Sequence, residues 1–204
     1  MNKLLLFILI LFVIPIQTNP THNLLNLLRN VLIKSSHKYG IRKLNIKTCE
    51  ENLLLFNKIM NKHSIFYWLS EGTALGVIRE NRILPWDDDV DVSFNYEYRD
   101  IFIKQALPSL LLNGFVVAEV RYGGNFIVLI RKNEKIDIDI VQKNGNCTAL
   151  RTINTNYNNE CNNLIPYLKG IHPVTFLNTN FNVPGVEYLE YLYGKTWKIP
   201  SKKK

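Results

Sequence analysis

The sequence is poor in cysteine: its 204 residues include three, Cys49, Cys147 and Cys161. It contains no C-x-x-C pair and no cluster of cysteine with histidine. This argues against a structural zinc site, which needs four closely spaced thiolate or imidazole ligands. Cys147 and Cys161 lie in an asparagine-rich segment and could form a disulfide in an oxidising compartment, which would leave Cys49 over.

The chain also lacks the compositional bias of disordered and repetitive proteins. Hydrophobic residues make up 47% and charged residues 21%, which is ordinary for a globular protein, and no internal repeat is present. The length suits one domain with a full core. The net charge of +8 is not gathered into a basic stripe, and three of its positive charges are the terminal Lys202 to Lys204. We therefore expect no nucleic-acid partner.

No apolar run reaches the roughly 20 residues of a membrane-spanning helix. The longest, residues 4–16, follows a short basic start and has the length of a signal-peptide core. Residues 1–19 are therefore predicted to be a cleaved signal peptide or an uncleaved signal-anchor. Either form would deliver the rest of the chain to the lumen of the secretory pathway (ER or Golgi) or to the exterior, as a secreted protein or as a type II membrane protein anchored through residues 4–16.

Residue patterns divide the rest into a stalk or linker helix at 20–48, one domain at 49–200 and a basic tail at 201–204. Within the domain, Thr48 is expected to cap the first helix. Three further helices are predicted at residues 74–80, 97–112 and 186–193, the last followed by Gly194 in a terminating position. Five strands are predicted at residues 64–69, 90–94, 115–122, 125–131 and 135–141, before an asparagine-rich loop that extends to about residue 163. This order predicts an α/β or α+β domain with a mixed sheet.

The acidic run at residues 85–91, PWDDDVD, is the strongest chemical feature. Four aspartates this close together repel one another by several kcal/mol at an effective dielectric of about 20, so a compensating cation is expected. On a strand, Asp89 and Asp91 point to the same face. Side-by-side carboxylates of this kind bind hard cations such as Mg²⁺ or Mn²⁺ and leave coordination positions for phosphate oxygens.

A second acidic strand, residues 136–140 with the sequence IDIDI, repeats this alternation. Charged residues inside an apolar strand indicate a site rather than a surface. If the two strands are neighbours, either Asp137 or Asp139 completes a three-carboxylate metal site. The residue pattern alone leaves that choice open.

The segment at residues 70–76, SEGTALG, predicts a strand end, a tight turn and the start of a helix. The backbone N–H groups at Gly72 and Thr73, together with the Thr73 hydroxyl, could hold a phosphate there with the help of the helix dipole. Arg79, two turns further on, could add a bidentate phosphate contact.

Residues 67–79, YWLSEGTALGVIR, and 83–92, ILPWDDDVDV, together resemble the signature of the LicD/fukutin-related phosphotransferases. The chain's end, with VP at 183–184, YL at 188–189 and YGKTWKIP at 193–200, is similar to that family's closing motif. The resemblance implies a nucleotidyltransferase-like fold of the DNA polymerase β type, with a mixed sheet flanked by helices. It also implies that Gly72 and Thr73 hold donor phosphates and that Asp89 and Asp91 bind metal. It implies Asp139 or Asp137 as the third carboxylate, and Asp139 matches the family's strand pattern better because Ile140 and Val141 follow it.

The same resemblance implies transfer of a phospho-alcohol, such as phosphocholine or ribitol phosphate, from a CDP-linked donor to a glycan or glycoprotein acceptor. Metal ions would neutralise the donor diphosphate, and the third carboxylate would accept the proton of the acceptor hydroxyl. Two other hypotheses remain. One is a D-x-D glycosyltransferase that uses a nucleotide-sugar, and the other is an inactive family member that acts as a binding protein.

Overall fold

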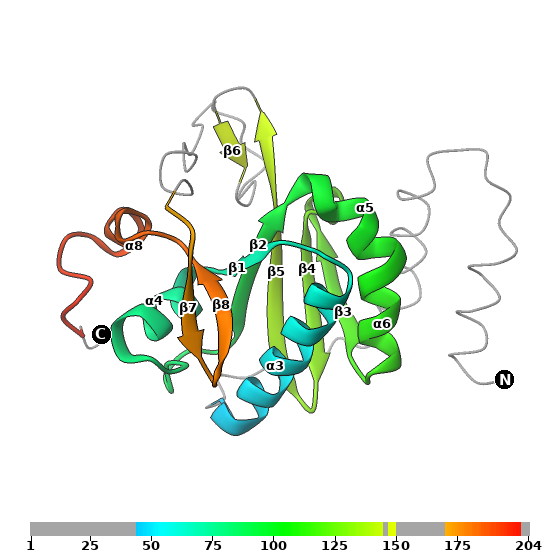
Figure 1. The fold of residues 1–204 in the computed structure, drawn as a ribbon, viewed down its shortest axis with the longest axis horizontal. Coiled ribbons are helices and arrows are strands. Elements are labelled where there is room, and N and C mark those ends of the chain that lie inside the picture. The colour runs from blue at the N-terminus through cyan, green and yellow to red at the C-terminus, as the bar shows by residue number, and fades with distance from the viewer. Residues whose placement is uncertain (1–43, 145–146, 150–169, 201–204) are drawn as a thin grey trace, which may run out of the picture.

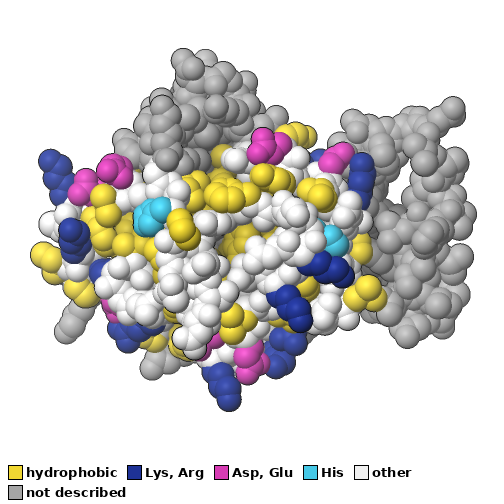
Figure 2. Space-filling view, in the orientation of Figure 1, with side chains coloured by type: hydrophobic (Ala, Val, Ile, Leu, Met, Phe, Trp, Pro, Cys, Tyr) yellow, Lys and Arg dark blue, Asp and Glu magenta, His cyan; other side chains and the backbone are white. Residues whose placement is uncertain are grey.

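The computed structural model describes residues 44–144, 147–149 and 170–200. The predicted leader, nearly all of the predicted linker, Cys161 and the basic tail lie outside these residues. Within the described ranges, no helix is both long enough and apolar enough to cross a lipid bilayer. Figure 2 shows basic side chains scattered over one face with acidic ones between them, and no basic stripe on that view of the described residues.

A mixed sheet of six strands organises the fold (Figure 1), with the order β1-β2-β5-β4-β3 and with β6 paired to β5 off this path. Its strands are β1 (Tyr67–Leu69), β2 (Val90–Asn95), β3 (Val116–Arg121), β4 (Phe126–Arg131), β5 (Glu134–Asn144) and β6 (Cys147–Ala149). β2 and β5 run parallel, whereas the other neighbours pair antiparallel. The two strands that carry the acidic residues are therefore direct neighbours.

Helices and a hairpin surround this sheet. Helix α3 (Ile46–Lys62) crosses one face with α5 (Arg99–Ile101) and α6 (Leu107–Leu112) beside it, as Figure 1 shows. Near the β1 edge lie α4 (Glu71–Glu80), α8 (Val186–Tyr193) and the hairpin of β7 (His172–Phe176) with β8 (Thr179–Val183). The β8 strand is tied to β1 because the Asn182 side-chain amide donates to the Tyr67 carbonyl at 2.9 Å.

The two sheet faces differ because side chains alternate along each strand. The face towards α3 is apolar, and its residues on β2 and β5 belong to the main core: Val90, Val92, Phe94, Ile136, Ile138 and Ile140. The opposite face carries the acidic residues of the same strands. On that face the buried side chains of β4 form a small separate apolar cluster, Phe126, Val128 and Ile130.

The first helix starts earlier than the sequence pattern predicts. α3 begins at Ile46, and its cap is Asn45, whose side chain accepts a hydrogen bond from the Thr48 N–H at 3.1 Å. Thr48 is therefore not the cap. Both residues are good capping types, and the tertiary fold selects the earlier one. Residues 46–48 belong to this helix rather than to the linker. Cys49 is fully buried in it.

The helix predicted at residues 97–112 is wrong as a single regular element. It is divided into a 3₁₀ turn (Tyr96–Tyr98), the short α5, a π-helical segment (Phe102–Ala106) and α6. Pro108 stands in the first turn of α6. Because proline has no N–H and its ring collides with the carbonyl four residues earlier, a wider π turn before it relieves the conflict.

Most other predicted elements are confirmed within a few residues, and α8 ends at Tyr193 with Gly194 at a positive φ of 75°. The strand predicted at residues 64–69 is shorter, because Ser64 adopts a left-handed φ of 55° that closes the turn after α3. The patterns gave no prediction for the β7–β8 hairpin. They also placed β6 inside a loop.

Candidate functional site

The acidic loop enters β2 at the point where α4 begins. The Ser70 N–H donates to the Asp91 carbonyl at 3.1 Å, and the Asp91 N–H donates to the Thr73 hydroxyl oxygen at 2.8 Å. Ser93 then donates from its hydroxyl to that of Ser70 at 2.9 Å. These three bonds join the turn at residues 70–73 to β2. The predicted phosphate turn and the predicted metal strand are therefore one structural unit.

The parallel register places the acidic residues of β2 and β5 together. Asp91 lies opposite Asp137, and Ser93 lies opposite Asp139. Carboxylate oxygens of Asp89, Asp91 and Asp137 all lie within 4.8 Å of one another. Three hard oxygen donors at this spacing fit the first coordination shell of a small divalent cation. The structure thus groups Asp137 with the D-x-D pair, and Asp139 lies two residues further along β5.

Asp87 and Asp88 form a second, overlapping group with Asp89, again with carboxylate oxygens within 4.8 Å. Asp88 is exposed, whereas Asp87 lies against Gly72 in the first turn of α4. A β-carbon added at Gly72 would stand 2.1 Å from the Asp87 carboxylate oxygen Oδ2. A larger residue at position 72 would therefore displace the Asp87 carboxylate.

Burial and like charge act together on the central aspartate. Asp91 is 5% exposed, and its burial is the largest cause of a pKa well above the ordinary value. Neighbouring acidic groups raise the pKa of Asp91 further: Asp89, Glu71, Asp137 and Asp87. The concentrated negative charge of this site favours the binding of a cation.

Lys135 is a basic residue at this site that the sequence patterns did not single out. Its ammonium lies 3.0 Å from Asp89 Oδ2. Burial lowers the pKa of Lys135, but the charges of Asp137 and Asp89 outweigh burial and raise it above the ordinary value. The alternation of charge at the start of β5, Glu-Lys-Ile-Asp, was the available signal.

The first residue of α4 has a strained backbone conformation. Glu71 adopts a left-handed φ of 43°, a conformation that favours glycine. Its N–H donates to the hydroxyl of Tyr188 at 3.3 Å. Thr73 is buried, and its hydroxyl oxygen already accepts the Asp91 N–H. The Thr73 hydroxyl therefore fixes the start of α4 to β2, and the phosphate role of Gly72 and Thr73 stays a prediction.

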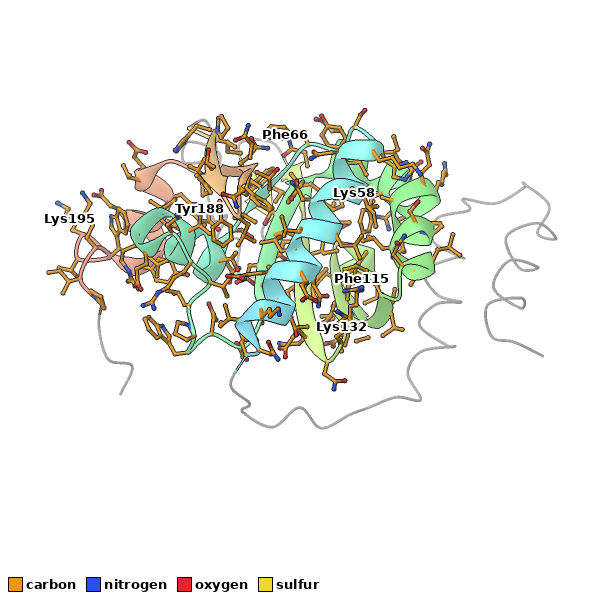
Figure 3. The ribbon with its side chains drawn as sticks, turned by 60° about the horizontal axis from the view of Figure 1, so that its bottom comes forward. Lys58, Phe66, Phe115, Lys132, Tyr188 and Lys195 are labelled. Carbon is orange, nitrogen blue, oxygen red and sulfur yellow. The ribbon has the colours of Figure 1, made fainter. Side chains whose placement is uncertain are left out.

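Tyr188 belongs to α8 and brings the end of the chain to the site. Figure 3 shows Tyr188 beside α4, and its side chain is 1% exposed. Burial raises the pKa of Tyr188 and also that of Tyr193, for which the charge of Asp91 is the next cause. Both tyrosines therefore lie within electrostatic range of the carboxylates. Their presence in the closing motif was a signal that strand and helix patterns alone did not use.

Arg79 stands apart from the carboxylates in the last turn of α4. It donates to the Trp197 carbonyl at 3.1 Å and from Nε to the Glu80 carboxylate at 2.8 Å. The contact with Trp197 holds the segment after α8 against α4, and the pair with Glu80 lies within α4. The phosphate contact of Arg79 stays a prediction, and the side chain lies on the helix that starts at the site.

Solved structures share this fold. The antibiotic-resistance factor ANT(2'')-Ia superposes with a TM-score of 0.50 at 14% identity, covering 72% of this chain and 71% of the other. The lincomycin-bound lincosamide adenylyltransferase LnuA superposes with a TM-score of 0.50 at 13% identity, covering 76% and 89%. Identities this low support the nucleotidyltransferase-like fold alone, and the predicted fold class is confirmed.

Sequence relatives are closer. An uncharacterized protein of Rickettsia prowazekii is 34% identical over 90 residues, which cover 44% of this chain and 32% of the relative. Ribitol-5-phosphate transferase FKTN of Macaca fascicularis is 30% identical over 165 residues, covering 76% and 34%. The lipopolysaccharide cholinephosphotransferase LicD of Haemophilus influenzae is 40% identical over 52 residues, covering 26% and 18%. The chain thus spans at most about a third of the length of these relatives.

The family model described as "LicD/FKTN/FKRP, nucleotidyltransferase domain" matches residues 64–186, more than half of the chain. This range contains the predicted phosphate turn, the D-x-D pair and the acidic strand β5. The chain belongs to the LicD/FKTN/FKRP nucleotidyltransferase-domain family.

Proposed function

We propose that this chain is a Mg²⁺- or Mn²⁺-dependent phosphotransferase that moves a phospho-alcohol from a CDP-linked donor to a glycan or glycoprotein acceptor. The observation that carries the proposal is the group of Asp89, Asp91 and Asp137, with carboxylate oxygens within 4.8 Å, beside the start of α4. Two relatives named as ribitol-5-phosphate and choline-phosphate transferases support a phospho-alcohol as the transferred group.

Asp89, Asp91 and Asp137 would hold the metal, with Asp139 as the other candidate for the third position. A bound Mg²⁺ or Mn²⁺ would neutralise the donor diphosphate and make its phosphorus more electrophilic. Backbone N–H groups at Gly72 and Thr73 would orient a donor phosphate at the N-terminus of α4. The carboxylate next to the acceptor hydroxyl, Asp137 or Asp139, would take its proton.

The transfer is a substitution at phosphorus. A bond forms between the acceptor oxygen and the phosphorus of the phospho-alcohol, and the bond from that phosphorus to CMP breaks. The hydroxyl proton goes to the carboxylate. Catalysis in this scheme comes from positioning and electrostatics, as in other phosphoryl transfers. The apolar segment at residues 4–16 supports action in the secretory pathway lumen or in a membrane-anchored form.

An assay of CMP release by the purified full-length chain tests the proposal. Incubation with Mg²⁺, a glycan acceptor and either CDP-ribitol or CDP-choline should release CMP, and Asp91→Ala should abolish the release. Stabilisation by UDP- or GDP-sugars, with turnover of those donors instead, would favour the glycosyltransferase hypothesis. Metal binding without turnover of any donor would favour an inactive binding protein.

A further inference from the structure

Two lysines lie close together in the sequence, Lys132 in the turn from β4 to β5 and Lys135 at the start of β5, and each pairs with one carboxylate. Lys132 lies 2.7 Å from Glu51 on α3, with 53% of its side chain exposed. Lys135 lies 3.0 Å from Asp89, with 22% exposed. Figure 3 shows Lys132 at this turn, near the start of α3. The pair offers a comparison between a surface ion pair and one that reaches the candidate metal centre.

Lys135 reaches the centre because of the strand register. Ile136 is paired with Val90, so the residues before them, Lys135 and Asp89, are also adjacent. The Lys135 ammonium forms an ion pair with Oδ2 of Asp89, one of the three carboxylates that could hold a metal. A divalent cation bound to these carboxylates must therefore share Asp89 with a positive charge already beside it.

The Lys135 ammonium and a divalent cation bound to Asp89 would both be positive and would repel each other. In a partly buried site, solvent screens this repulsion only weakly. Lys135 should thus weaken the binding of a divalent cation on its own. The effect reverses when the ligand is a diphosphate. A lysine has a flexible four-carbon stem and three N–H donors, so it can turn from a carboxylate to a neighbouring phosphate oxygen.

We propose that Lys135 exchanges Asp89 for a phosphate of the donor and thereby couples metal binding to donor binding. The diphosphate part of this inference rests on the proposed function, whereas the competition with metal rests on the ion pair alone. Lys135 is then a donor-binding residue that makes each ligand bind better in the presence of the other. Such coupling is reciprocal by thermodynamic linkage.

Lys135→Met tests this inference, with Lys132→Met as the matched control. By calorimetry, we expect Lys135→Met to bind Mn²⁺ alone about tenfold more tightly than the wild type, and to bind CDP at saturating Mn²⁺ about tenfold more weakly. Lys132→Met should change neither dissociation constant. Lys135→Arg, which keeps the charge, should retain CDP affinity within about threefold.

Thermal unfolding in EDTA supplies a readout without substrate. Removing the ammonium leaves the carboxylates less compensated, so Lys135→Met should melt at a lower temperature than Lys132→Met and gain more from added Mn²⁺. Unchanged Mn²⁺ or CDP affinity in Lys135→Met would overturn the inference and leave the proposed function intact. Absence of Mn²⁺ binding in the wild type would overturn both. If Lys135→Met fails to fold, loss of CDP affinity in Lys135→Arg to the level of no binding would also refute it.

Discussion

Replacing Asp91 by asparagine should stabilise the protein in the absence of metal while removing its response to metal. Asp91 is 5% exposed, and its carboxylate oxygen lies within 4.8 Å of those of Asp89 and Asp137. Asparagine keeps the shape of the side chain and the backbone bonds to Ser70 and Thr73. It removes only the negative charge.

The size of the effect follows from the geometry. Two unit charges at about 5 Å repel by about 3 kcal/mol at an effective dielectric of 20, and Asp91 has two such neighbours. The ammonium of Lys135 and partial protonation of the group offset most of this repulsion. We therefore expect a net gain of about 1–2 kcal/mol, or about 2–8 °C in melting temperature for a domain of this size.

The pH dependence has a definite sign. Because the pKa of Asp91 is raised in the folded state, the folded protein binds this proton more tightly than the unfolded chain. Its stabilising contribution is complete below the ordinary pKa of about 3.9 and is lost as the pH rises through the folded value. In EDTA, the advantage of Asp91→Asn over the wild type should therefore grow with pH.

Differential scanning fluorimetry in EDTA and in Mg²⁺, at several pH values, measures both effects. Asp100→Asn is the control, because Asp100 is an exposed partner of Lys104 with 62% of its side chain exposed. A lower melting temperature for Asp91→Asn in EDTA, or a Mg²⁺ response equal to that of the wild type, would refute the reasoning.

Three further changes test the turn at the site. Gly72→Ala puts a β-carbon 2.1 Å from Asp87 Oδ2, so the Asp87 carboxylate must move, and calorimetry should show CDP affinity reduced by about tenfold or more. Thr73→Val leaves the buried Asp91 N–H without its acceptor and should cost about 1–3 kcal/mol in urea unfolding. Tyr188→Phe removes the hydroxyl that accepts the Glu71 N–H. It should lower the free energy of unfolding by about 1 kcal/mol and also lower kcat.

The threonine and tyrosine changes each have a comparison variant. Thr73→Ser keeps the hydroxyl and should stay within about 1 kcal/mol of the wild type. Tyr67→Phe removes a buried hydroxyl that donates to Asn57 at 2.8 Å, away from the carboxylates. It should lower stability without changing kcat. Equal kcat losses in the two tyrosine variants would show that Tyr188 acts only through stability, and normal CDP binding by Gly72→Ala would contradict the packing argument.

Local patterns predicted much of the fold because most elements here follow local rules. The alternation at residues 136–140 predicted a strand with aspartates on one face, and β5 has that form. Gly194 after an apolar helical stretch predicted the end of α8. The pattern failed where a local rule had two solutions, as with Asn45 and Thr48 at the start of α3, or where Pro108 required an irregular turn inside a helix.

The aspartates themselves, the D-x-D spacing and the motifs of the family were determined by the sequence alone, since these depend only on residue identity and local geometry. The sequence alone did not show which of Asp137 and Asp139 lies beside the D-x-D pair, because residues two apart on a strand share a face and only the register with β2 separates them. That register places Asp137 opposite Asp91 across 46 residues of chain. The ion pair of Lys135 and the contact of Tyr188 with Glu71 were likewise decided by the tertiary structure, because packing of distant segments, which no local pattern records, brings these groups together.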